Sequence, residues 1–150
     1  MPRPQKKRIV YQPPVHTRFK PTGVRSSFLE ILPLTLDELE AIRLADYEGF
    51  DHADSALEME ISRSTFSRLV ERARCKVAEF LIEGRHLQIE GGEVHFQSNV
   101  MRCSDCGHLL NVNFDSDQTT CPSCGSPNLI DLAGGFGHGR CCRHHHNRRR

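Results

Sequence analysis

The stretch that decides the fold is 51–69, DHADSALEMEISRSTFSRL, which predicts two helices separated by a tight turn. Asp51 and Ser62 are good helix N-caps, because their side-chain oxygens can accept hydrogen bonds from the first free amides of a helix. A helix-turn-helix needs a small residue where its helices cross, and apolar residues around the turn and inside the second helix. These requirements are met, in order, by Ala56, Met59, Ile61, Phe66 and Leu69.

A further helix is predicted before this stretch. Thr35-Leu-Asp-Glu38 is a capping box, so the helix should begin at Leu36. Leu36, Leu39 and Ile42 supply its apolar stripe, and Gly49 follows its end. Together with the pair above, this helix predicts a three-helix unit over 35–86.

The last of the three helices is predicted from Arg63 to about Glu83, with Gly84 placed to close it. Its apolar residues recur at steps of three and four and predict one buried face, made of Phe66, Leu69, Val70, Ala73, Val77, Phe80 and Leu81. Glu60 stands where the turn usually has glycine. We expect Glu60 to adopt a left-handed conformation, at a cost of about 1 kcal/mol.

The first two turns of this last helix carry polar side chains suited to duplex DNA. Arginine can bind guanine O6 and N7 with two hydrogen bonds, and serine and threonine can reach phosphates or base edges. The residues predicted to contact DNA are Arg63, Ser64, Thr65, Ser67, Arg68 and Arg72, with Arg3, Lys6, Lys7 and Arg8 from the N-terminal arm. The alternative is a generic helical bundle whose arginines only face water.

Charge is strongly segregated along the chain although the net charge is only +1. Residues 1–25 hold seven Lys and Arg and no acid, residues 26–62 carry a net charge of −9, and residues 63–86 carry +3. Basic segments separated by acidic ones favour local contact with a polyanion. The alternative is a solvated mosaic of surface charge.

Five segments, taken together, resemble an uncharacterised family of proteins thought to bind DNA, domain-of-unknown-function family 134. They are MPRP at 1–4, FKP at 19–21, LTLDELEAIRLAD at 34–46, MEISRSTF at 59–66 and LQIEGG at 87–92. The resemblance implies a helix-turn-helix similar to region four of bacterial sigma factors, which reads promoter DNA in the major groove. Family members usually have Gly at the position of Glu60 and Gln-Glu at the positions of His52 and Ala53. No segment resembles the domain of a sigma factor that melts promoter DNA.

Four cysteines have the spacing of a metal site. Cys103-x-x-Cys106 and Cys121-x-x-Cys124 enclose 14 residues, and each pair is followed by a glycine. This pattern predicts one structural Zn²⁺ per chain, held by Cys103, Cys106, Cys121 and Cys124. Iron in the same four thiolates is an alternative, as are a redox dithiol and a disulfide pair. The odd total of seven cysteines and a reducing compartment favour metal.

The segment between the two cysteine pairs alternates like a strand over 109–114, turns at 115–117 and begins a return strand at 119–120. It predicts a zinc ribbon at 101–132. Two short strands around Gly91-Gly92 predict a hairpin linker at 87–100. The tail at 133–150 is interpreted as disordered and basic, with incidental metal affinity. The alternative is a metal site made from Cys141, Cys142, His138 and His144 to His146.

The sequence as a whole predicts a mainly α protein: a basic Pro-rich arm at 1–34, the helix-turn-helix domain, and the zinc ribbon. The function expected is sequence-specific binding of double-stranded DNA and regulation of transcription, with a homodimer or RNA polymerase contact to increase the binding surface. The alternative is a zinc-ribbon module for protein interaction or metal handling. No enzyme motif is recognised, and four thiolates leave no open metal position. We expect a cytoplasmic protein with no membrane partner.

Overall fold

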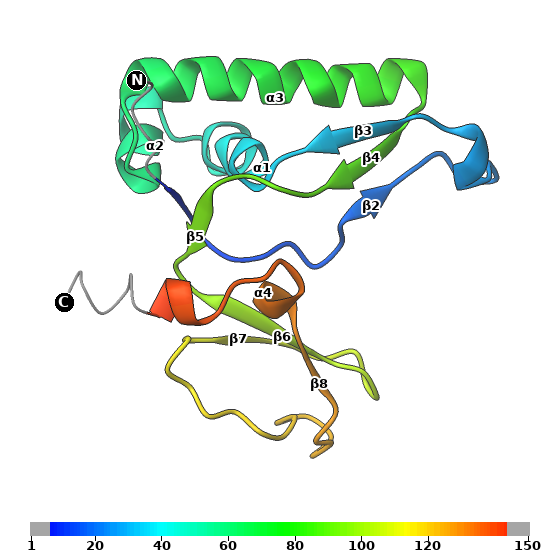
Figure 1. The fold of residues 1–150 in the computed structure, drawn as a ribbon, viewed down its shortest axis with the longest axis vertical. Coiled ribbons are helices and arrows are strands. Elements are labelled where there is room, and N and C mark those ends of the chain that lie inside the picture. The colour runs from blue at the N-terminus through cyan, green and yellow to red at the C-terminus, as the bar shows by residue number, and fades with distance from the viewer. Residues whose placement is uncertain (1–6, 144–150) are drawn as a thin grey trace. The chain divides into compact units, whose positions relative to one another are not determined.

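The computed structural model describes residues 7–143 and divides the chain into two compact units. Unit 1 contains Met1–Val10 and His16–Val94, and unit 2 contains Tyr11–Val15 and His95–Arg150. Figure 1 shows the elements of both units. The predicted arm at 1–34 contributes three strands, which are β1 (Arg8–Val10), β2 (Arg18–Phe19) and β3 (Ile31–Leu34), and the 3-10 turn η1 (Ser26–Phe28).

The first helix of unit 1, α1 (Leu36–Ile42), begins where the capping box predicts. The Thr35 hydroxyl accepts a hydrogen bond from the Glu38 amide at 3.3 Å, and the Glu38 carboxylate accepts one from the Thr35 amide at 3.0 Å. A π-helical turn, η2 (Arg43–Tyr47), continues α1. The predicted apolar stripe is partly wrong, because Ala41 and Leu44 are buried in the core, whereas Leu39 and Ile42 are only half-buried.

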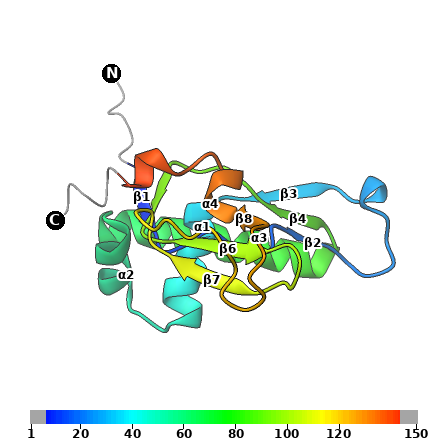
Figure 2. The ribbon, with the colours of Figure 1, turned by 90° about the horizontal axis from the view of Figure 1, so that it is seen from below.

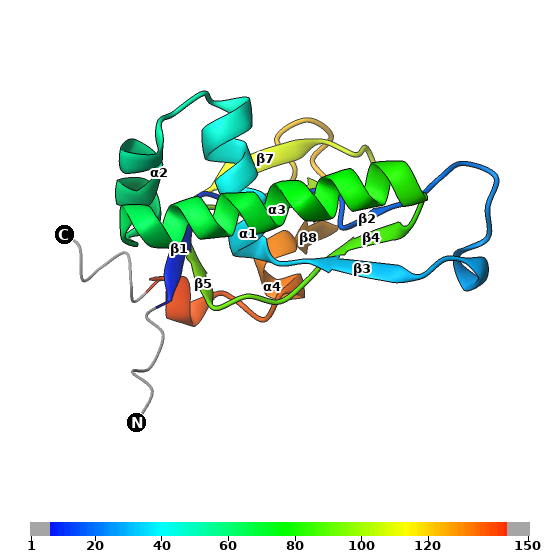
Figure 3. The same ribbon diagram turned by 90° about the horizontal axis from the view of Figure 1, so that it is seen from above.

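The next two helices, α2 (His52–Met59) and α3 (Arg63–Glu83), have the predicted bounds. Side chains of α1, η2, α2 and α3 form one core cluster: Ala41, Leu44, Ala56, Met59, Phe66, Leu69 and Val70. The predicted buried face of α3 does not extend to its end, since 69% of Leu81 is exposed. Figure 3 shows the reason: α3 continues well past α1 and α2, so nothing from those helices covers its last turns.

The expectation of a mainly α protein is wrong. Helices make up 38% and strands 20% of the chain, and the strands of the described residues form three sheets. In unit 1, β4 (His86–Ile89) lies between β2 and β3, antiparallel to β2 and parallel to β3. The strands β3 and β4 flank the three helices along the chain, and the parallel pairing joins the two ends of that helical segment.

The predicted hairpin around Gly91-Gly92 is also corrected. β4 and β5 (Val94–Phe96) lie on either side of these glycines but do not pair with each other. β5 instead pairs with β1, and β4 pairs with β2 and β3. The intervening loop packs on the start of α1, where the Leu36 amide donates to the Gly91 carbonyl at 3.1 Å. A Cβ on Gly92 would lie 2.8 Å from an Asp37 carboxylate oxygen, so this position requires glycine.

Unit 2 contains a three-stranded sheet of order β7-β6-β8, seen in Figure 2, followed by α4 (Leu132–Gly135). Its strands are β6 (Asn99–Cys103), β7 (Leu109–Val112) and β8 (Leu129–Asp131). The predicted zinc ribbon is not found: no strand begins at 119–120, and β7 pairs with the strand before it. Pro122 and the second cysteine turn occupy the predicted return segment, so regular pairing resumes only at Leu129, against β6.

Candidate nucleic-acid interface and metal centre

The turn between α2 and α3 is fixed by local hydrogen bonds and one strained residue. Asp51 accepts from the Asp54 amide at 2.7 Å to cap α2, and Ser62 accepts from the Thr65 amide at 3.2 Å to cap α3. Glu60 has φ 56° and ψ 44°, the predicted left-handed conformation, and ends α2. These contacts set the direction in which α3 leaves the turn.

The two helices are also joined side by side near their starts. His52 of α2 hydrogen-bonds through Nδ1 to the Ser67 hydroxyl at 2.8 Å, and its ring meets Phe66 edge-on with centroids 5.3 Å apart. The Ser67 hydroxyl also donates to the Arg63 carbonyl at 3.0 Å. Ser67 is thus held between the helices, while His52, where the family usually has Gln, supplies a contact that the sequence did not predict.

The remaining predicted residues at the start of α3 face solvent. Arg63, Ser64 and Arg68 are exposed, and Thr65 is half-buried against the Ser62 cap, with 2.7 Å between their hydroxyl oxygens. The structure therefore brings two arginines and one serine together on an open surface. A protruding helix end with these side chains has the donors needed to bind base edges and phosphates.

The basic side chains of unit 1 differ in how they are paired. Arg74 forms two hydrogen bonds to Asp46 at 2.8 and 3.0 Å, and Lys76 binds Glu38 at 2.6 Å. Within residues 7–143, no ion pair is found for Arg63, Arg68 or Arg72. The unpaired arginines therefore lie in the first half of α3, and the paired bases in the second.

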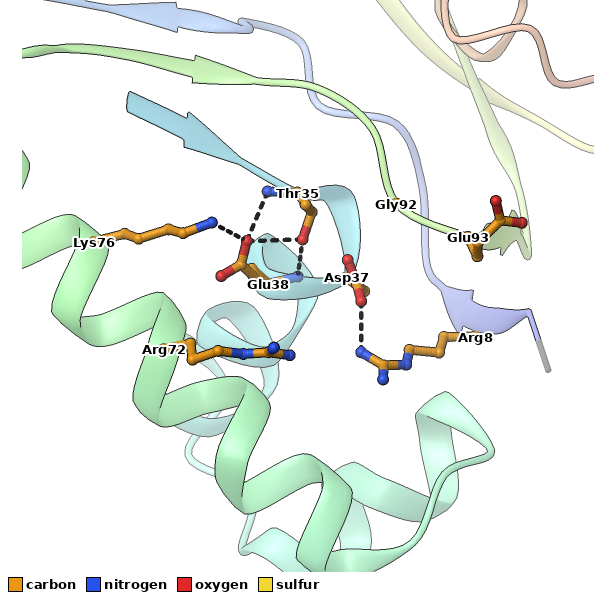
Figure 4. Close-up of a pocket in the computed structure, with 8 residues that line it drawn as sticks. All are labelled: Arg8, Thr35, Asp37, Glu38, Arg72, Lys76, Gly92 and Glu93. Atoms are coloured by element: carbon orange, nitrogen blue, oxygen red, sulfur yellow. Dashed lines mark hydrogen bonds and ion pairs between the residues drawn. The ribbon is translucent and has the colours of Figure 1, made fainter. Parts of the chain in front are cut away.

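Two of the predicted DNA-contacting arginines line a cavity of about 340 Å³ in unit 1. Arg8 donates to Asp37 at 2.6 Å across this cavity, and Figure 4 shows Arg72 reaching from α3 toward the same pair. Arg8 is consequently committed to an internal ion pair. Lys7 is exposed, and Arg3 and Lys6 lie outside the described residues.

The four predicted metal ligands lie together in unit 2. The sulfur atoms of Cys103, Cys106, Cys121 and Cys124 all lie within 4.8 Å of one another, and none of these cysteines is in a disulfide. The Cys103–Cys124 and Cys106–Cys121 sulfur pairs are each separated by 3.6 Å. Four sulfurs around zinc at about 2.3 Å would be about 3.8 Å apart. The cluster can therefore hold a metal ion in a tetrahedron of sulfurs.

The two cysteine turns have matching backbone geometry. The amides of Gly107 and Gly125 donate to the carbonyls of Cys103 and Cys121 at 2.9 and 2.8 Å. Both glycines have positive φ, 76° and 75°, which a side chain would disfavour. Asp105 of the first turn accepts hydrogen bonds from Ser126 and Asn128 of the second, which lower the pKa of its carboxyl group. Sequence spacing predicted the cysteines but not this link.

The thiols differ in how readily they lose a proton. The backbone amide of Cys106 lowers the pKa of Cys103 to about 7. The Ser126 amide acts in the same direction on Cys124, but the facing sulfurs of Cys103 and Cys106 outweigh it and raise that pKa to about 12. Like charges at this separation oppose each other. A bound cation would remove this repulsion and allow all four thiolates to form.

A second group in unit 2 also has the composition of a metal site. His95, His138, Cys141 and Cys142 bring their ligand atoms within 4.8 Å of one another. Three of these residues lie in the tail that was interpreted as disordered, whereas residues 133–143 are described and Cys142 is buried. His144 to His146 lie outside the described residues.

Comparison with known proteins places the chain among uncharacterised bacterial proteins. The family model "Protein of unknown function DUF134" matches residues 1–97. A "UPF0251 protein" of Chloroherpeton thalassium is 48% identical over 132 residues, covering 88% of this chain and 87% of that protein. The chain belongs to this family. A UPF0251 protein of Moorella thermoacetica is 44% identical over 145 residues, covering 96% and 95% of the two chains.

The DUF134 model ends before the first cysteine pair, but the match to the Moorella protein spans nearly the whole chain. A UPF0251 protein of Pelotomaculum thermopropionicum is 44% identical over 126 residues, covering 84% of this chain and 95% of that protein. No solved structure matches the chain. Among the described residues, no helix is long and apolar enough to cross a membrane.

Proposed function

We propose that this chain is a sequence-specific double-stranded DNA-binding protein that regulates transcription, with the first turns of α3 in the major groove. One observation carries the proposal. Arg63 and Arg68 are exposed at the start of α3 and have no ion pair within residues 7–143, whereas Arg74 and Lys76 further along are paired. Unpaired guanidinium groups on a rigid helix are suited to bidentate contacts with guanine.

The surrounding geometry supports the same binding mode. The left-handed Glu60 and the caps at Asp51 and Ser62 fix α2 against α3, and the shared core of α1, α2 and α3 holds α3 as a rod of about 30 Å. In this proposal α2 crosses the phosphate backbone and α3 reads the bases, as in region four of bacterial sigma factors. Ser64 contacts a base edge or phosphate, and Ser67 keeps the helices together.

The N-terminal arm adds phosphate contacts through Arg3, Lys6 and Lys7. Arg8 is omitted from this set because its guanidinium is bound to Asp37 at 2.6 Å. Arg72 is assigned to the phosphate backbone. A single helix pair covers little of a duplex, so the proposal includes a homodimer or a contact with RNA polymerase. We propose that the protein acts in the cytoplasm, where its thiols remain reduced.

The proposal is tested by binding to a duplex enriched from a random-sequence pool, measured at several salt concentrations. The affinity should fall linearly with salt on logarithmic axes, because bound phosphates release counterions. Arg63→Ala and Arg68→Ala should each weaken binding to the enriched duplex by about 1–3 kcal/mol, roughly 5- to 160-fold. They should weaken binding to random duplex less.

Arg85→Ala is the matched control. It removes the same charge, but Arg85 lies beyond the end of α3 and is paired with Glu30, Glu79 and Glu83. It should leave the preference for the enriched duplex intact. If the Arg63→Ala, Arg68→Ala double variant binds as tightly as the parent, the proposal is wrong.

A second candidate is a protein-interaction or metal-handling module, favoured by the two groups of metal-binding side chains in unit 2. In that case the helices are a scaffold. The same experiment separates the two candidates, since a metal-handling module would show no enrichment of any duplex sequence.

A further inference from the structure

Two segments of unit 2 that are far apart in sequence bring four nitrogen and sulfur ligands together. His95 belongs to β5, and His138, Cys141 and Cys142 follow α4. Cys142 Sγ lies 3.5 Å from His138 Nδ1, 3.8 Å from His95 Nδ1 and 3.8 Å from Cys141 Sγ. His138 Nδ1 lies 3.3 Å from Cys141 Sγ.

These separations match the edges of a tetrahedron around one metal ion. With zinc–sulfur bonds of about 2.3 Å and zinc–nitrogen bonds of about 2.0–2.1 Å, two sulfurs would be about 3.8 Å apart and a sulfur and nitrogen about 3.5 Å apart. We propose that His95, His138, Cys141 and Cys142 form a second metal site, separate from the four-cysteine site, that holds a zinc ion.

The neighbouring cysteines are able to share one ion because of the local backbone. Residues 140–143 are helical, and the Arg143 amide donates to the Gly139 carbonyl at 3.0 Å. This turn brings the two sulfurs to 3.8 Å, a separation that allows both to bind without forming a disulfide. The glycines at 137 and 139 leave His138 room to turn back toward them.

The surroundings of Cys142 are those of a buried thiolate. Its side chain is fully buried, and the Phe96 amide donates to its sulfur at 3.2 Å. The ring of Phe96 packs edge-on against His138, with centroids 5.1 Å apart, and also contacts Phe136. Hydrogen bonds and apolar packing of this kind orient metal ligands and keep water away.

The ligand set determines the class of metal and the role of the site. Two thiolates and two imidazoles favour zinc over magnesium or calcium, which prefer oxygen. Four protein ligands fill a tetrahedron and leave no position for a substrate. The ion would therefore fasten residues 138–142 to β5, and would support the fold of unit 2 rather than catalyse a reaction.

The test is a zinc titration of the full-length, demetallated, reduced protein against a chromophoric chelator. The parent should bind two zinc ions per chain. His95→Ala, Cys141→Ser and Cys142→Ser should each bind one. Cys75→Ser, which changes an exposed cysteine of α3, should still bind two. A parent that binds one zinc, or site variants that still bind two, would overturn the proposal.

Two further measurements guard against a variant that fails to fold and against ligands from the tail. Cobalt bound to the parent should give two tetrahedral spectra, and Cys141→Ser should lose the one with the weaker thiolate charge-transfer band while keeping the four-sulfur spectrum. Replacing His144, His145 and His146 together with alanine should leave two ions bound. If that triple variant binds only one, the tail histidines hold the second metal and the proposed ligand set is wrong.

Discussion

Glu60 is the residue at which the turn is most strained. It is the only non-glycine residue with positive φ among the described residues, at 56°. Glycine accepts this conformation without steric cost, so Glu60→Gly should raise the free energy of unfolding by about 0.5–1 kcal/mol. Denaturant unfolding followed by helical circular dichroism measures the change.

Glu58→Gly is the control for that prediction, because Glu58 is exposed inside α2. There glycine should lower the free energy of unfolding by about 1 kcal/mol. Opposite signs at two positions in one helix region would separate backbone conformation from loss of charge. A destabilising Glu60→Gly would show that contacts of the glutamate side chain outweigh the strain.

Asp46 provides a pH dependence at the scale of one ion pair. Its hydrogen bonds from Arg74 lower the pKa of the carboxyl group below 3.8. The stabilisation is therefore complete above the unfolded pKa and is lost as pH falls through the lower, folded pKa. Because both side chains are nearly half exposed, Asp46→Asn should cost only about 0.2–1 kcal/mol at neutral pH.

The stability difference between the parent and Asp46→Asn should shrink as pH falls below about 4. Helical circular dichroism under denaturant at each pH gives the measurement. Glu71→Gln, at an exposed position on the same helix, should differ little from the parent at any of these pH values. A difference that persists unchanged at pH 2 would contradict the assignment to this carboxylate.

At the scale of elements, α3 is stabilised by its first half. Phe66 is fully buried among α1, η2 and α2, so Phe66→Ala should cost about 3–5 kcal/mol. Leu81, predicted to share that face, is 69% exposed, and Leu81→Ala should change stability by less than about 0.5 kcal/mol. Thermal unfolding of the two variants tests this contrast, and equal losses would contradict the position given to the end of α3.

The helices could be predicted from sequence because their signals are local. The caps at Thr35, Asp51 and Ser62 and the glycine after Glu83 set the starts and the end that the structure has. The buried stripe of α1 could not be predicted, since Asp37 and Glu38 are also buried there by ion pairs with Arg8 and Lys76, which come from distant elements. Apolar periodicity does not register such pairs.

The strands were missed for a related reason. β2 pairs with β4 across about seventy residues of sequence, and two-residue β2 has no alternation to detect. The four-cysteine site could be predicted because both pairs keep a recognisable spacing. The second metal-binding group could not, because it needs His95, which only the fold brings beside the tail cysteines.

At the scale of the whole molecule, the two units should respond differently to loss of metal. Both proposed sites lie in unit 2, whereas unit 1 has its own helical core. Chelation under reducing conditions should therefore remove hydrogen-exchange protection from 95–143 and leave protection in α1 and α3 nearly unchanged. Loss of protection in both regions together would contradict independent stabilisation of the units.

The central claim is that the start of α3 binds base edges in the major groove. The most direct measurement is dimethyl sulfate methylation of guanine N7, a major-groove atom, on the enriched duplex with the protein bound. The account predicts protection of particular guanines that disappears at one position with Arg63→Ala and at another with Arg68→Ala, but persists with Arg85→Ala. Specific binding that leaves guanine N7 reactivity unchanged would contradict it.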